Sequence, residues 1–151
     1  MKFEYQVCAV DLSKKLKKLG VKQDSLFYFA RRGIYVPGFS ADEEQQYKII
    51  LYKNYNKLDK RSYSAFTVAE LGEILPFELL TENFYEETLS MGLHFEVDFQ
   101  KTWSVSYYEK SEEKLRCVDK NEANARAKMI IYLIEKKLVD DEWREKWLVK
   151  S

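Results

Sequence analysis

One imidazole and two carboxylates alternate along the middle of the chain, at His94, Glu96 and Asp98. Side chains at i, i+2 and i+4 of a strand share one face, so these groups could bind a divalent cation or exchange protons with a ligand. The same alternation is typical of the water-facing side of a sheet, and a catalytic histidine needs a partner placed beside it. We favour the solvated face, and we predict no catalytic residue and no metal site.

Other patterns that carry chemistry are missing from the sequence. Cys8 and Cys117 lie far apart, and with only one histidine they cannot complete a four-ligand zinc site. Free cysteine is usually buried as a small hydrophobic residue, which is what we expect of both. The five glycines are isolated, so they form no phosphate-binding loop. The sequence therefore predicts no cofactor.

Basic side chains gather near the start of the chain and are candidates for partner binding. They are Lys14, Lys15, Lys17, Lys18, Arg31 and Arg32. They could contact phosphates or an acidic protein, although a lysine-rich helix face is more often a solubilising surface. Lys plus Arg and Asp plus Glu both number 25, so the net charge is zero. A dedicated nucleic-acid binder usually carries a basic excess, so we expect a protein partner, with nucleic acid as the alternative.

Two tryptophans in the C-terminal segment, Trp143 and Trp147, are further candidates for partner binding. They stand four residues apart, and therefore on one face of a short helix predicted for 140–149. Each ring buries roughly 150–250 Å², so such a pair is rarely left in water. Residues 139–151 therefore pack on their own domain or against a partner or second copy. We favour packing within the chain, which could be a monomer or a homodimer.

The elements that must position these residues are indicated by caps and periodicity. Asp11 predicts the cap of a helix that ends at Leu19 and is closed by Gly20. Leu12 and Leu16 share one face of this helix with Leu19, and the lysines occupy the other. Short strands are expected at 26–30, 34–36 and 47–52, with a turn between the first two.

The second half of the chain carries the clearest local signals. Thr67 and Glu70 form a capping box that opens a short helix, which Pro76 stops. The segment 77–92 is interpreted as a frayed helix or an irregular loop. Alternating residues predict a hairpin of two strands and a possible third strand, at 93–99, 103–108 and 115–118.

The strongest helix signal covers Asp119 to Leu138. Asp119 and Glu122 are spaced as an N-terminal capping pair. Apolar residues then recur at helical spacing and form a face that must be buried: Ala123, Ala127, Ile130, Ile131, Ile134 and Leu138. The whole chain, residues 1–151, suits one domain of the α+β class, an antiparallel sheet with three to four helices packed mainly on one face.

Three blocks of sequence are distinctive: VCAVDLSKKLKKLGVKQ at 7–23, a block at 62–76 that ends in SAFTVAELGEILP, and a block at 122–135 that ends in ANARAKMIIYLIE. Together they resemble a group of small proteins carried by phages, prophages and other mobile elements of gut-type bacteria. The resemblance implies a mobile-element origin and a bacterial cytoplasm, and it carries no activity or site residues with it. A cytoplasmic location also agrees with the lack of an apolar run long enough for a leader or a membrane span.

Three functions remain open from the sequence, in this order. The first is a non-enzymatic accessory protein of a mobile element that binds a protein partner. The second is a nucleic-acid-binding module, since two or three strands followed by a helix resemble RNA-binding modules, with Lys120, Arg126 and Lys128 near the helix start. The third is a small enzyme or ligand-binding protein that uses a tyrosine-rich pocket with His94, Glu96 and Asp98.

Overall fold

The computed structural model describes residues 6–31, 47–51, 62–80, 88–96, 101–109 and 111–150. These form four helices, α1 (Val10–Lys18), α2 (Val68–Ile74), α3 (Glu122–Glu135) and α4 (Asp141–Trp147). They also form seven strands, β1 (Phe27–Arg31), β2 (Tyr47–Leu51), β3 (Tyr63–Ser64), β4 (Glu78–Leu80), β5 (Thr88–Glu96), β6 (Thr102–Glu109) and β7 (Glu112–Asp119). The α+β class predicted from the sequence is confirmed.

The strands form two antiparallel sheets, with orders β2-β1-β3 and β4-β5-β6-β7. The predicted hairpin is confirmed, because Leu93 lies opposite Val105 and Phe95 opposite Trp103. The predicted third strand is confirmed as β7, which is longer than expected at both ends. The strand predicted at 34–36 lies outside the described residues.

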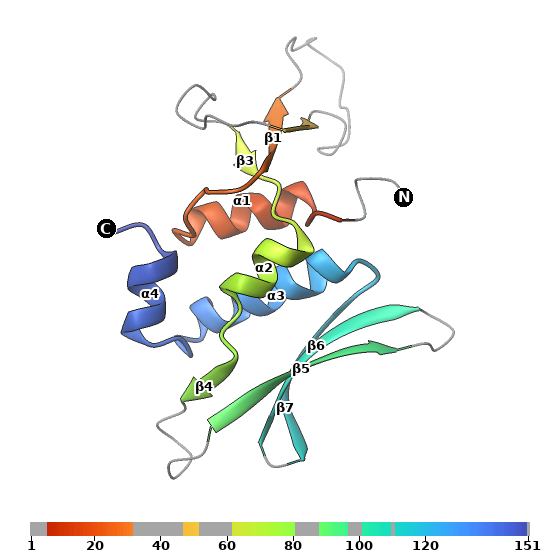
Figure 1. The fold of residues 1–151 in the computed structure, drawn as a ribbon, viewed down its shortest axis with the longest axis vertical. Coiled ribbons are helices and arrows are strands. Elements are labelled where there is room, and N and C mark those ends of the chain that lie inside the picture. The colour runs from red at the N-terminus through yellow and green to blue at the C-terminus, as the bar shows by residue number, and fades with distance from the viewer. Residues whose placement is uncertain are drawn as a thin grey trace.

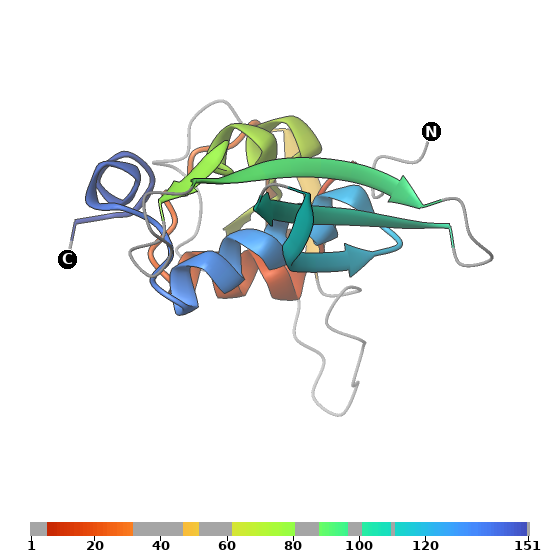
Figure 2. The same cartoon turned by 90° about the horizontal axis from the view of Figure 1, so that it is seen from below.

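The helices lie between the two sheets (Figure 1). α1 runs beside the three-stranded sheet on one side and the α2–α3 pair on the other, and the four-stranded sheet covers the far side of that pair. Figure 2, seen from below, shows α3 against the four-stranded sheet and α4 at one end of the molecule. α3 therefore contacts α1, α2, β6 and β7, which makes it the centre of the fold.

The core is built around α3. The predicted apolar face is buried except for Leu138, which is partly buried, and residues outside that face are buried too, such as Ala125, Met129 and Leu133. A helix that is apolar on most sides is one that packs on several neighbours, which agrees with the central position of α3. From the four-stranded sheet, Val105 and Tyr107 enter the same core.

α1 begins differently from the sequence prediction. Asp11 lies in the first turn, and the N-cap is Ala9, which has no capping side chain. The Ala9 N–H instead donates to Asn124 Oδ1 of α3, at 2.7 Å. The prediction for Asp11 is wrong, because the helix begins at Val10, before Asp11. The prediction that Gly20 ends this helix is confirmed, since Gly20 has a φ of +88°.

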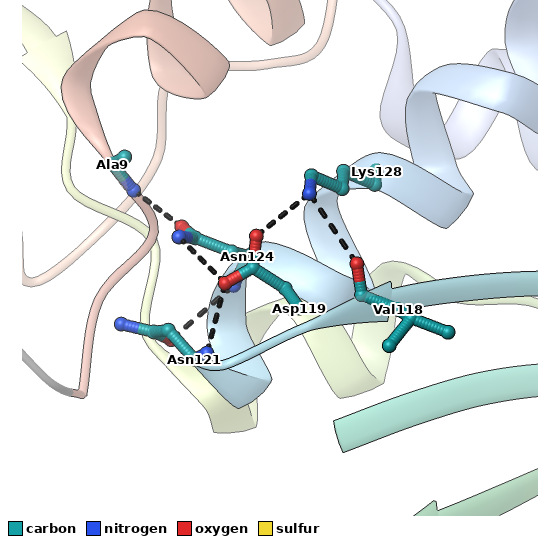
Figure 3. A network of polar contacts seen from close by, with 6 residues as sticks. All are labelled: Ala9, Val118, Asp119, Asn121, Asn124 and Lys128. Carbon is teal, nitrogen blue, oxygen red and sulfur yellow. Dashed lines mark hydrogen bonds and ion pairs between the residues drawn. The ribbon is translucent and has the colours of Figure 1, made fainter. Parts of the chain in front are cut away.

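The start of α3 also differs from the prediction (Figure 3). Its N-cap is Asn121, whose side chain accepts from the Asn124 N–H, so a capping pair of Asp119 with Glu122 is wrong. Asp119 is the last residue of β7 and lies too early to cap the helix. It accepts hydrogen bonds from the Asn121 N–H at 2.9 Å and from Lys128 Nζ at 2.7 Å. The helix ends at Glu135 rather than Leu138.

The prediction of a frayed helix or an irregular loop at 77–92 is wrong where the structure describes this segment. Glu78–Leu80 and Thr88–Glu96 are paired strands. Strand pairing, which is not a local property, decides their conformation. The capping box just before this segment is confirmed, because Thr67 and Glu70 exchange both of its hydrogen bonds.

Candidate functional site

The lysines of α1 divide into two pairs with different surroundings. The ammonium of Lys14 lies 5.1 Å from the ring centre of Tyr47 and 5.8 Å from that of Tyr63. Lys17 lies 5.0 Å from the Tyr63 ring and donates to a backbone carbonyl, Ser62 O, at 2.9 Å. These two lysines are half-buried and hold α1 on the three-stranded sheet, which the sequence prediction of a uniform outer face did not anticipate.

The other pair, Lys15 and Lys18, is exposed. Lys15 Nζ lies 2.9 Å from Glu135 Oε1 at the end of α3, so the two helices are joined by an ion pair across their surface. A shallow groove follows this junction, and its lining is formed by Asp11, Lys14, Lys15, Lys18, Leu19 and Glu135. We take this α1–α3 groove as the candidate functional site.

The groove carries both signs of charge, with an excess of positive charge. Three ammonium groups face two carboxylates, and Leu19 supplies an apolar surface at one end. Lys18 forms no ion pair with any residue that the structure describes, so its charge is directed to solvent. A surface of this kind can attract an anionic group.

An aromatic side chain lies near the groove. Tyr132 of α3, three residues before Glu135, is 37% exposed, and the Lys136 ammonium lies 6.0 Å from its ring centre. Residues three apart on a helix lie on neighbouring parts of its surface, so Tyr132 stands beside the groove. Of the other predicted basic residues, Arg31 ends β1, where its side chain is not described, and Arg32 lies outside the described residues.

The two tryptophans of the C-terminal segment pack in or against the hydrophobic core. Trp143 is 8% exposed, and its indole N–H donates to the Ile74 carbonyl at the end of α2, at 2.7 Å. Trp147 is half-buried against the same core. The segment after it is paired with the turn that follows α1, since Leu148 bridges to Val21. The expectation that residues 139–151 pack within the chain is confirmed for this helix, and Trp143 is inaccessible to a partner.

Neither thiol is activated. Cys8 is fully buried beside Ser13 Oγ, and burial raises the pKa of its thiol to about 11. Burial also raises the pKa of Cys117, which is partly exposed. A nucleophilic cysteine needs a lowered pKa, so both thiols have the properties of packing residues. The expectation of burial is confirmed fully for Cys8 and in part for Cys117.

The structure describes only part of the predicted group of His94, Glu96 and Asp98. His94 and Glu96 lie on β5 opposite Ser104 and Thr102, but their side chains, like the whole of Asp98, fall outside what the structure describes. Within the described residues, no three His, Cys, Asp or Glu side chains are arranged to hold a metal ion.

The cations at the start of α3 are used inside the chain. Arg126 Nη2 lies 2.7 Å from Glu122 Oε1, and Lys128 Nζ lies 2.7 Å from Asp119 Oδ2. Two of the three basic residues on which the nucleic-acid alternative depended are therefore already paired. Lys120 remains exposed.

Comparisons with protein-family models, curated proteins and solved structures gave no match for this chain. Among the described residues, no helix has the length and apolar character needed to cross a membrane. Sequence reasoning missed Asp11 and Glu135 as neighbours of the lysines in the groove. The spacing of Asp11 and Lys15, four residues apart, was a usable local signal, whereas nothing local links α1 to Glu135.

Proposed function

We propose that this chain is a non-enzymatic accessory protein of a bacterial mobile element, which acts in the cytoplasm by binding a protein partner at the α1–α3 groove. The observation that carries the proposal is the division of the α1 lysines. Lys14 and Lys17 hold the helix against tyrosine rings, while Lys15 and Lys18 are presented to solvent. Because the backbone of this helix is already fixed, binding of a partner has to order only the side chains of these lysines.

The mixed charge of the groove favours a protein over a nucleic acid. A nucleic-acid backbone is negative along its whole length, so its phosphates would meet Asp11 and Glu135 as well as the lysines. A protein segment can place carboxylates near the lysines and neutral or basic groups near the two carboxylates. The internal pairing of Arg126 and Lys128 also supports this choice.

The test is a pull-down with two charge-reversal variants. One carries Lys15→Glu and Lys18→Glu in the groove, and the matched control carries Lys101→Glu and Lys120→Glu. The control lysines are exposed and do not line the groove, and both variants change the net charge equally. Each tagged protein is incubated with bacterial lysate, with and without nuclease treatment, and the captured protein is then purified and bound again in isolation.

We expect one protein to bind the wild type and the control in both steps and to be lost from the groove variant. Equal capture by the two variants would show that the groove is not the binding site. Capture that disappears after nuclease treatment, with direct binding to nucleic acid, would replace the proposal with the nucleic-acid alternative. Circular dichroism of each variant establishes that it is folded.

A further inference from the structure

α4 is held in place by residues that are far from it in the sequence. The Trp143 indole N–H donates to the Ile74 carbonyl at the end of α2, at 2.7 Å, and the Trp143 ring lies in the hydrophobic core. Just after α4, Leu148 bridges to Val21, which follows α1. We call the surface that receives α4, which includes Ile74 and Val21, the α4 site. These contacts can form equally well when α4 comes from a second copy of the chain.

The turn that joins α3 to α4 is strained at one residue. Lys137 has a φ of +57°, in the left-handed region that favours glycine. The Lys137 N–H donates to Ile134 O at 3.1 Å, and the Leu138 N–H donates to Leu133 O at 2.9 Å. This pair of hydrogen bonds is a common helix ending in which glycine usually occupies the position of Lys137. The turn is therefore made without the residue that suits it.

The sequence allows α3 to continue where the structure turns. Residues 122–151 contain no glycine and no proline, and the lysines and leucine at 136–138 are good helix formers. In the structure α4 turns away from the direction of α3 (Figure 1). A straight continuation would instead carry Trp143 about 12 Å beyond Glu135, at 1.5 Å per residue. α4 would then leave the α4 site of its own chain.

We propose that the α4 site binds α4 of a second copy, in a dimer whose chains exchange this helix and in which α3 runs into α4 without a turn. The occupant is specified because α4 itself fills this surface in the single chain. Exchange makes the same contacts between chains and relieves the strain at Lys137 in both copies. The residues that line the α1–α3 groove all precede the turn, so the dimer carries two grooves and can hold a partner at two points.

Asp140 opposes the exchange. Its carboxylate accepts from the Trp143 N–H at 2.7 Å and caps α4 in the single chain. In a continuous helix this N–H donates to the Val139 carbonyl instead, so the cap is not needed and aspartate is a poor helix former. Substitutions at Lys137 and at Asp140 should therefore shift the balance between monomer and dimer in opposite directions.

The dimer dissociation constant is measured by analytical ultracentrifugation for wild type and three variants. Lys137→Gly relieves the strain in the monomer by about fivefold per chain, so the constant should rise by about 25-fold or more. Asp140→Ala removes a cap that only the monomer uses, and should lower the constant by a similar factor. The control Lys137→Ala keeps the Cβ atom and the strain, and should stay within about threefold of wild type. Circular dichroism establishes that each variant is folded.

A disulfide identifies the chain that supplies α4. Val21 and Leu148 lie opposite each other in an antiparallel bridge, where Cα atoms are about 4.5–5.5 Å apart, and this separation suits a disulfide. One chain with Val21→Cys and one with Leu148→Cys are expressed together and oxidised, both with Cys117→Ser. The linked peptides are identified by mass spectrometry. A single chain that carries both cysteines is the control for the geometry.

We expect a disulfide between positions 21 and 148 of different chains, and opposite shifts of the dissociation constant for Lys137→Gly and Asp140→Ala. Absence of the link between chains overturns the proposal, even if the protein dimerises, because the dimer then uses another surface. Equal dissociation constants for the two variants also overturn it. Neither measurement depends on Lys15 or Lys18, so the proposed function stands or falls separately in the pull-down.

Discussion

Glu70 offers the most direct test of how α2 is fixed in the fold. Its carboxylate accepts hydrogen bonds from the Thr67 N–H at 2.7 Å and the Thr67 hydroxyl at 2.9 Å. The Glu70 N–H donates to Thr67 Oγ1 at 3.2 Å, which completes the capping box. The same carboxylate accepts from the Ser25 hydroxyl at 3.0 Å and the Leu26 N–H at 2.9 Å. One side chain therefore caps α2 and also joins it to the segment that leads into β1.

The cost of Glu70→Ala can be worked from these contacts. Loss of the capping box costs about 1 kcal/mol. Ser25 is 9% exposed, and its hydroxyl loses a charged acceptor, which costs about 1.5 kcal/mol. The Leu26 N–H is exposed and can bond to water instead, so it adds little. We expect Glu70→Ala to lower the free energy of unfolding by about 2–3 kcal/mol.

The matched control is Glu73→Ala, in the same helix, where the side chain is exposed. It should change the free energy of unfolding by no more than about 0.5 kcal/mol. Both variants are unfolded in urea and followed by tryptophan fluorescence, to which the buried Trp143 contributes. Equal midpoints for the two variants, with unchanged slopes, would refute the role assigned to Glu70.

Further predictions concern individual side chains in the same structure. Lys137 has a φ of +57° after α3, so Lys137→Gly should raise the free energy of unfolding by about 1 kcal/mol in urea titrations. Trp143→Phe removes the indole hydrogen bond to α2 and should lower it by about 2 kcal/mol. A thiol reagent should modify Cys117 before the buried Cys8, which should react only on unfolding, and mass spectrometry of the labelled peptides shows the order. Burial alone would raise the pKa of Asp119, but hydrogen bonds from Lys128, the Asn121 N–H and Asn124 outweigh it and hold this pKa below its ordinary value. Asp119→Asn should therefore be less stable than wild type at neutral pH, and the difference should shrink as the pH falls below about 4, where the unfolded carboxyl becomes protonated. Thermal midpoints at pH 7 and pH 3 check this, and a constant difference would contradict it.

The features of the fold that depend on residues close together in the sequence were predicted correctly. Gly20 closes α1, the Thr67 box opens α2, and the β5–β6 hairpin follows the alternation of Leu93 and Phe95. Each depends on residues a few positions apart. The alternation in fact extends back through Leu89 and Met91, so the early part of β5 was also visible in the sequence.

The errors arose where a distant residue replaced a local one. α1 begins at Val10, before Asp11, and the Ala9 N–H at its start donates to Asn124 from α3. Pairing with β6 continues through Asp119, which moves the start of α3 to Asn121. The different surroundings of the α1 lysines could not be predicted from local sequence for the same reason. Lys14 and Lys17 contact Tyr47 and Tyr63, which belong to the three-stranded sheet.

The pairing of the C-terminal segment with the turn after α1 has a consequence for protein synthesis. The Lys22 N–H donates to Trp147 O at 2.9 Å, the Val149 N–H donates to Gly20 O at 2.7 Å, and Lys22 Nζ donates to the carbonyls of Glu145 and Lys146. Residues 20–22 leave the ribosome long before residues 145–149. Until then, the end of α1 lacks these partners and the Trp143 position in the core is empty. This part of the core can therefore fold only after residues 143–149 have left the ribosome.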